Sequence, residues 1–293
     1  MRVRVSAAIV VAALTGSCPS LGLAQSSGGV PASGFYVGAG VSANLMVPVN
    51  QSMFAQGVSA VTQAGALAAT GAAGGPTNPH PPNAPTISPS AQLGYFQQLS
   101  DSRWLVGGKL TYNYINATST DHFVRVPQAG SFTLVGGGPI TSFTGNVVIQ
   151  SYKITADHQF AFVPQVGMTF DRSFVYFGAG PSITRTEVSL NNVVGFANIN
   201  GAAGTSITGT PVTYSSTQWL IGATFTAGAT YFLTPSWFID MGYTFTMTDL
   251  WNTAYASPFR NSTQGFNTIG VLSGSYTGGL NTHSLTVSIN RKF

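Results

Sequence analysis

The stretch that decides the fold is WLIGATFTAGATY, residues 219–231. Its odd-numbered positions are apolar or aromatic, from Trp219 to Tyr231, whereas its even-numbered positions from Gly222 onward are Gly or Thr. Successive side chains of a β-strand point to opposite faces. The alternation therefore predicts a strand with one apolar face and one small, polar face, which is typical of a transmembrane β-strand between lipid and lumen.

The same alternation is present in seven other segments. It is clear in residues 237–246 and 284–293, and it is noisier in residues 35–45, 91–95, 104–114, 160–170 and 175–183. Pro164 has no N–H for a β-ladder, so it predicts a bulge in its strand. Together the segments predict an all-β fold, an eight-stranded antiparallel up-and-down transmembrane β-barrel with long extracellular loops.

Composition excludes the other classes of protein. Only 6% of the 293 residues are charged, whereas 44% are hydrophobic. A soluble domain carries about 25% charged residues, and disorder requires low hydrophobicity with high net charge. Beyond the first 24 residues no run approaches the roughly 18 apolar residues of a spanning helix. The chain is apolar on average without long apolar runs, as a membrane barrel is.

The beginning of the chain predicts export. Arg2 and Arg4 precede a short apolar core at residues 9–14, and small residues lead to Ala24. This pattern predicts a signal peptide over residues 1–24 that is cleaved after Ala24. A short segment, 25–33, and the barrel, 34–293, follow. Cleavage removes two arginines and lowers the net charge from +4 to +2, so we expect no nucleic-acid partner.

The connections between predicted strands are of two kinds. Three are short, at residues 99–102, 171–173 and 233–236, and four are long, at about 48–87, 119–145, 191–216 and 252–279. The two kinds alternate along the chain, which is the order of short periplasmic turns and long outer loops. This order places both termini in the periplasm. The 48–87 loop is uncharged and either extends outside or folds down and plugs the barrel.

A few polar residues fall on the lumen-facing parity. A charge buried in the lumen needs a partner, because an unpaired buried charge costs several kcal/mol. We therefore predict that Lys109 and Asp240 share one lumen polar network, with Gln165 and Gln92 as further members. Lys153 and Asp157 fall on the same parity, so we count them in the predicted lumen network as well.

Large aromatic residues lie near the ends of the predicted strands. Trp and Tyr are enriched at the two membrane–water interfaces. We therefore predict that the interface aromatics are Trp104, Trp219, Tyr231, Trp237 and Phe293.

Candidate chemical sites are weak. Residues 38–43 match a dinucleotide-binding pattern, but that pattern requires a helix after the glycines, and here the strand alternation continues. The histidines, His80, His122, His158 and His283, lack partners at metal-ligand spacing. Neighbouring residues of a strand diverge, so the Asp157–His158 pair is expected to be a poor chelate. We expect no catalytic, cofactor-binding or metal-binding residues and no cofactor.

Four segments resemble a known family. They are GFYVGAG at 34–40, FVYFGAG at 174–180, YFLTPSW at 231–237 and NRKF at 290–293. They resemble the outer-membrane β-barrel domains of OmpA-like and opacity-type surface proteins of Gram-negative bacteria. The resemblance implies location in the outer membrane, contact with outer-membrane lipid and lipopolysaccharide, and insertion by periplasmic chaperones and the barrel-assembly machinery. It further implies that Phe293 is the assembly signal.

Three functions are compatible with these features. The leading prediction is an integral outer-membrane protein with a structural or surface-interaction role and no enzymatic activity. The alternatives are a narrow passive channel for ions or small solutes and a lipid-modifying enzyme. The lipid A deacylases use a His-x-Ser pair, and no histidine of this chain has Ser two residues later.

Overall fold

The computed structural model describes residues 29–199, 202–263 and 265–293, and this part of the chain is antiparallel β-structure. It contains no helix long and apolar enough to cross a membrane. The strands are β1 (Ser33–Gln63), β2 (Ala66–Thr77), β3 (Ala84–Gln98), β4 (Trp104–Leu134), β5 (Thr141–Thr169), β6 (Ser173–Ile199), β7 (Ala202–Ser206), β8 (Val212–Phe232), β9 (Trp237–Thr248), β10 (Trp251–Thr263) and β11 (Phe266–Lys292). The predicted signal peptide, with Cys18, lies outside the described residues.

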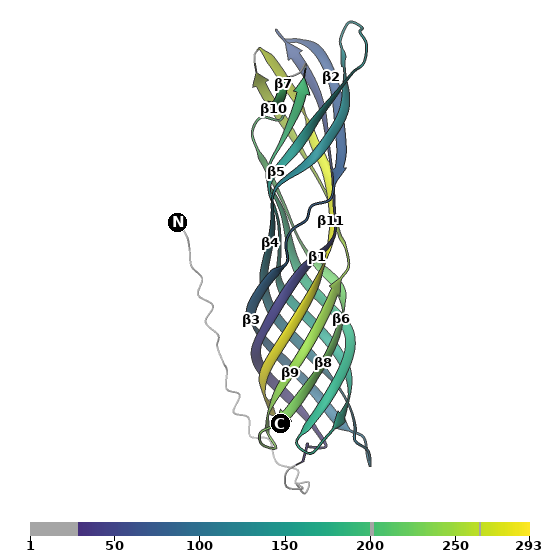
Figure 1. Cartoon of the computed structure of the whole chain (residues 1–293), viewed down its shortest axis with the longest axis vertical. Coiled ribbons are helices and arrows are strands. Elements are labelled where there is room, and N and C mark those ends of the chain that lie inside the picture. Colours follow the sequence, from purple (N-terminus) through teal and green to yellow (C-terminus); the bar gives the residue numbers. More distant parts are fainter. Residues whose placement is uncertain (1–28, 200–201, 264) are drawn as a thin grey trace, which may run out of the picture.

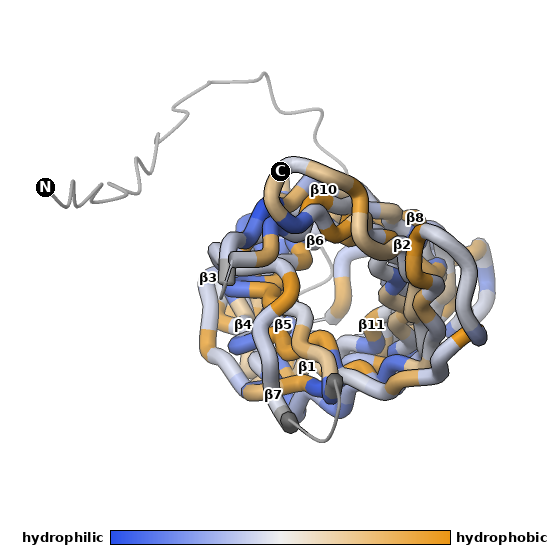
Figure 2. The backbone as a smooth tube through the Cα atoms, turned by 90° about the horizontal axis from the view of Figure 1, so that it is seen from above, coloured by the Kyte–Doolittle hydropathy of each residue, from blue (hydrophilic) through white to orange (hydrophobic). Residues whose placement is uncertain are grey.

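The pairings run in an uneven ring. In the lower half of the molecule the ring passes through β1, β3, β4, β5, β6, β8, β9 and β11 and returns to β1. In the upper half β2 takes the place of β3 between β1 and β4, and β10 pairs with β11 in place of β9. The result is a long cylinder, with the C-terminus at its lower end (Figure 1) and strands around a common axis (Figure 2).

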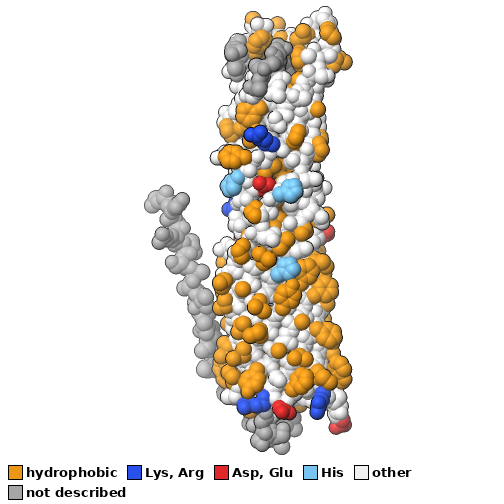
Figure 3. Space-filling model, in the orientation of Figure 1, with side chains coloured by type: hydrophobic (Ala, Val, Ile, Leu, Met, Phe, Trp, Pro, Cys, Tyr) orange, Lys and Arg blue, Asp and Glu red, His pale blue; other side chains and the backbone are white. Residues whose placement is uncertain are grey.

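The lower half separates apolar and polar side chains as the alternation predicts. On β8 the outward side chains include Trp219, Ile221 and Tyr231, all more than half or about half exposed, whereas the inward Thr224 and Thr230 are buried. Outward apolar side chains cover much of this half, and charged side chains lie at its lower edge (Figure 3). We call this outer surface the apolar belt, whose exposed members include Val37, Val41, Leu93, Val106, Phe162, Val175, Phe177, Ile183, Ile221, Phe225, Ile239, Met241, Leu285, Val287 and Ile289.

The four segments predicted to be long loops are mostly β-strand in the structure, so this prediction is wrong. The 48–87 region continues β1 and adds β2, and the 119–145 region is mostly β4 and β5. The 191–216 region holds the end of β6 with β7, and the 252–279 region holds β10 and the beginning of β11. These segments are rich in Gly, Ala, Asn and Pro, which are depleted in strands, so their local strand signal is weak. Pairing between long neighbouring strands outweighs that weak local preference.

The upper strand segments form a second folded part, which we call the projection: residues 50–83, 117–156, 187–218 and 249–279. Its interior is apolar and includes Met53, Ile149, Tyr152, Trp251 and Tyr276, each at most 1% exposed. The regions predicted as outer loops therefore have a hydrophobic core of their own.

The ladders are irregular between the two halves. The register shifts between Val49 and Ser52 of β1 and between Tyr114 and Ala117 of β4. Asn50 and Asn116 lie at these shifts with φ of 54° and 47°, in the left-handed region that Asn tolerates better than most residues. Such β-bulges bend a strand and increase its twist. They therefore let the same long strands serve both halves.

The bulge predicted at Pro164 is wrong. The pairs Ala161 with Ser182 and Gln165 with Gly178 keep one register across it. Pro164 leaves a short unpaired gap in the β5–β6 ladder, because it has no N–H, without adding a residue to the strand. The bulge of β5 precedes Pro164 in the sequence and lies between Ala156 and Gln159.

The paired projection should resist proteolysis. When the folded protein is treated with proteinase K in detergent or vesicles, we expect cuts only at the connecting turns, above all at Gly136–Gly138, because paired backbone with a buried core does not enter a protease site. Mass spectrometry of the fragments is the measurement. Rapid cleavage within residues 50–77, at a rate matching the heat-unfolded control, would contradict the folded projection.

Candidate functional site

The most organised polar site lies inside the lower half, around Asp240 of β9. Its carboxylate accepts hydrogen bonds from Tyr176 Oη at 2.9 and 3.1 Å, from Thr230 Oγ1 at 3.0 Å and from Gln92 Nε2 at 3.1 Å. Lys109 Nζ of β4 lies 3.5 Å from Asp240 Oδ2. Four strands besides β9 thus contribute one partner each, because the inward face of each strand carries Asp240 or one of its partners.

Lys109 completes the charge balance. Its Nζ donates to Tyr176 Oη at 2.8 Å and lies 4.5 Å from the centre of the Tyr176 ring. Lys109 is 5% exposed and Asp240 is 6% exposed. Because the two charges are buried together and hydrogen-bonded, neither remains as an isolated charge in the interior.

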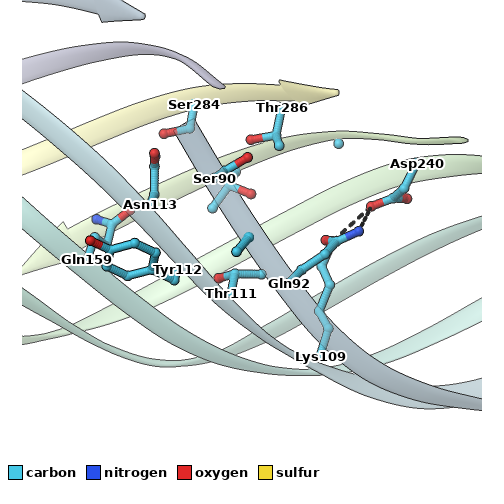
Figure 4. Close-up of a pocket in the computed structure, with 13 residues that line it drawn as sticks. Ser90, Gln92, Lys109, Thr111, Tyr112, Asn113, Gln159, Asp240, Ser284 and Thr286 are labelled. Atoms are coloured by element: carbon cyan, nitrogen blue, oxygen red, sulfur yellow. Dashed lines mark hydrogen bonds and ion pairs between the residues drawn. The ribbon is translucent and has the colours of Figure 1, made fainter. Parts of the chain in front are cut away.

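Further polar groups extend this network. Gln92 Nε2 also donates to Ser288 Oγ at 2.9 Å and to Asn290 Oδ1 at 2.8 Å. A neighbouring set of hydrogen bonds joins Ser42, Asn44, Ser88, Asn113 and Ser284. Figure 4 shows Gln92 and Lys109 pointing toward Asp240, with the hydroxyl-bearing residues to one side. A cavity of about 40 Å³ lies among them, which is room for a few water molecules.

An aromatic layer closes the cylinder below this network. It consists of Tyr36, Phe96, Leu105, Phe174, Tyr176, Phe232 and Phe238. The phenol of Tyr36 occupies the space above Gly94, where an added Cβ would lie 2.6 Å from Tyr36 Oη. Val30 packs against the layer, and its N–H donates to the carbonyl of Asp171 at 3.1 Å. We call this layer with Val30 the lower plug.

The core of the projection closes the cylinder above. Met46, Ile115 and Leu280 are fully buried where the two halves meet, and the aromatic side chains of the projection follow. Burial raises the pKa of Tyr152 and Tyr255 well above the ordinary tyrosine value. The polar network is thus enclosed between two apolar layers.

The predicted lumen residues divide into two groups. The structure brings Lys109 and Asp240 together, and it places Gln165 buried in the same lower interior, with Oε1 lacking a hydrogen-bond partner among the described residues. Lys153 and Asp157 do not join them. Lys153 is exposed on the outside, and Asp157 forms an ion pair with Arg185 of β6.

A β-bulge explains the error at Lys153 and Asp157. Below the bulge Gln159 and Gln165 face inward, whereas above it Tyr152, Ile154 and Ala156 do. One extra residue reverses the parity of every position beyond it. The bulge also corrects the expectation that Asp157 and His158 point to opposite faces, since neither belongs to the buried inner set.

The predicted interface aromatics all lie on the outside. Trp104, Trp219, Tyr231, Trp237 and Phe293 are between 42% and 64% exposed. The N–H of Phe293 donates to the carbonyl of Phe35 at 2.9 Å, which fixes the end of the chain on β1. The role of Phe293 in assembly stays a prediction.

Tyr36 and Tyr176 are site residues that were not predicted from the sequence. Both stand on the parity of small lumen residues, between apolar outward neighbours such as Phe35 and Val37 or Val175 and Phe177. A large aromatic on the small-residue parity, opposite glycine, is the signal that would have identified them.

Acidic and histidine side chains do not cluster in the described part of the chain. Among the described residues no group of three or more His, Cys, Asp or Glu could hold a metal ion. His158 and His283 are bonded through Nδ1 to Tyr112 and Tyr243, at 2.9 and 2.7 Å, on the outer surface. The buried network instead neutralises its charges and fixes the facing strands to one another.

No family model and no curated protein sequence matches the chain. Among solved structures, it is similar to the outer-membrane protein OprG of Pseudomonas aeruginosa, with 12% identity, a TM-score of 0.37 and coverage of 90% of this chain and 98% of that one. It is also similar to Ail of Yersinia pestis, with 10% identity, a TM-score of 0.25 and coverage of 83% and 98%. The outer-membrane protease OmpT of Escherichia coli gives 12% identity, a TM-score of 0.24 and coverage of 87% and 97%. These TM-scores are below 0.5, so the likeness carries no conclusion about this chain.

The buried ion pair should show strong coupling. We expect Lys109→Met and Asp240→Asn each to lower the free energy of unfolding by about 3–5 kcal/mol, because each leaves a buried group without its partner. The double variant should lose much less than the sum of the two. Urea unfolding in detergent micelles measures this, with Lys153→Met as a matched exposed control. Additive losses in the double variant would contradict the network.

Proposed function

We propose that the protein is an integral outer-membrane β-barrel that crosses the membrane as eight strands, is closed to solutes and holds the projection outside. Its role is structural or surface-interacting, and it has no enzymatic activity. The observation that carries this proposal is the filled interior, from the lower plug through the Lys109–Asp240 network to the apolar core of the projection.

The apolar belt supports the membrane location. From Trp219 to Tyr231 of β8 an outward face without charge extends along the strand for about 40 Å, at about 3.4 Å per residue. With a tilt of about 35–45° this covers about 30 Å of height, close to the roughly 25 Å apolar band of known barrels. Charged residues follow at both limits, with Arg172 at the turn below and Arg185 directly opposite Trp219 above.

The lower end supports the orientation. The three tight turns, both termini of the barrel and the lower plug lie there, and the projection lies at the other end. In outer-membrane barrels short turns are periplasmic and long connections are extracellular. We therefore propose that the projection lies outside the cell. We also propose that a signal peptide exports the chain and that periplasmic chaperones and the barrel-assembly machinery insert it. The inserted protein would then contact outer-membrane lipid and lipopolysaccharide.

We further propose that the chain belongs to the OmpA-like, opacity-type family. The support for this assignment is the set of sequence segments that resemble that family, at 34–40, 174–180, 231–237 and 290–293. The ring of pairings passes through eight strands, which is the number that the alternating segments predict.

The channel alternative conflicts with the packing. An eight-stranded barrel has an interior that side chains can fill, and here Phe96, Phe232 and Phe238 are at most 2% exposed across its lower end. The enzyme alternative has less support from the described residues. The two hydrogen-bonded His–Tyr pairs among them are on the outside, and no hydrogen bond joins either pair to both a nucleophile and a carboxylate.

Planar-bilayer recording tests the closed interior. The mature chain, refolded and checked by heat-modifiable migration on a gel, should insert and give no steady ohmic steps above the baseline. A general porin recorded under the same conditions shows that insertion and detection work. Reproducible steps from the mature chain would contradict the closed barrel, and a change in the mass of lipid A incubated with it would contradict the absence of enzymatic activity.

A further inference from the structure

A polar row follows the upper limit of the apolar belt across four adjacent strands. Tyr114 of β4 is directly opposite His158 of β5, and Arg185 of β6 is directly opposite Trp219 of β8. Asp157 and His158 lie within the β5 bulge, and Asp157 forms an ion pair with Arg185 there. The row therefore joins a cation, an imidazole and aromatic rings at one height of the outer surface.

Arg185 is held and still accessible. Its Nη1 forms the ion pair with the Asp157 carboxylate, and its side chain is 35% exposed. Among the described residues, the side chain of Arg185 has one hydrogen-bond partner, the Asp157 carboxylate. The remaining N–H groups of the guanidinium can therefore bind a ligand. Lys153 and Arg125, the next outward cations, lie farther up β5 and β4.

His158 is held in the same way. Its Nδ1 is 2.9 Å from Tyr112 Oη, and its ring packs 5.2 Å from the ring of Tyr114. These two contacts fix the orientation of the imidazole and leave Nε2 outside this bond. A similar pair, Tyr243 with His283, lies on β9 and β11, but no Lys or Arg stands beside it in the described pairings.

Apolar surface continues directly below the row. Ile183, two residues below Arg185 on the same face of β6, is 42% exposed, and the neighbouring Phe162 and Ile221 are 53% and 68% exposed. A ligand that covers this surface has an acyl part of membrane length and an anionic head that meets Arg185. Arg favours phosphate because its planar group donates several charge-assisted hydrogen bonds.

We propose that Arg185 and His158 bind a phosphate of an outer-leaflet lipid headgroup, with the acyl chains of that lipid on the belt below. This inference rests on the proposed membrane location and names a contact within it. Asp157 holds Arg185 in place and partly neutralises it. The site therefore takes phosphate through hydrogen bonds, together with the apolar contact, rather than through net charge alone.

Lipid retention tests the proposal. Wild-type protein, Arg185→Gln and the control Arg260→Gln, which removes an exposed cation of the projection, are refolded into phosphatidylcholine vesicles containing either phosphorylated or dephosphorylated lipid A. Native mass spectrometry after mild detergent extraction counts the lipid A retained. We expect wild type and Arg260→Gln to retain about tenfold more of the phosphorylated form, and Arg185→Gln to lose that preference.

Three results would overturn the inference. The first is equal retention of the two lipid A forms by wild type, and the second is an unchanged preference in Arg185→Gln. The third is loss of the preference in millimolar inorganic phosphate, which would identify free phosphate rather than a lipid headgroup as the ligand. Heat-modifiable migration of every sample separates these results from a failure of the proposed function, because a chain that does not insert at all contradicts the membrane barrel itself.

Discussion

For the membrane barrel proposed above, backbone hydrogen bonding in hydrocarbon is the constraint on which the structure depends. Each N–H and C=O in a bilayer needs a partner within the protein, and the ladder that begins between β1 and β3 returns to β1 through β11. Because the strands tilt and alternate, this one requirement also sorts the side chains. The apolar belt faces outward, and the small faces turn inward around Lys109 and Asp240.

The interior then determines what the protein can do. Glycines on the inward faces of β3 and β8 leave room for the phenols of Tyr36 and Tyr176, whose rings belong to the lower plug. Tyr176 in turn links the plug to the buried ion pair through its hydroxyl. Above them the same strands continue into the apolar core of the projection. Side chains therefore fill the cylinder from the lower plug to the core of the projection.

Much of the lower half could be predicted from the sequence, and most of the upper half could not. The alternation of residues 219–231 and 237–246 is regular, so the inward position of Asp240 and the outward positions of Trp219 and Trp237 follow from parity. The inward position predicted for Lys153 is wrong, because the alternation in β5 is too irregular to show where the bulge lies. The strands of the projection were missed because Gly- and Ala-rich segments carry little local preference, and only pairing with neighbours determines their structure.

The central claim is that alternate side chains of one strand face lipid and a closed interior. The described chain has no cysteine, so single cysteines at residues 219–231 can each carry a fluorescent label in the refolded protein. Quenching by brominated lipids is the measurement. We expect strong quenching at 221, 223, 225, 227 and 229 and weak quenching at 222, 224, 226 and 228. Quenching without a two-residue period, or quenching of both sets by a water-soluble quencher, would contradict the account.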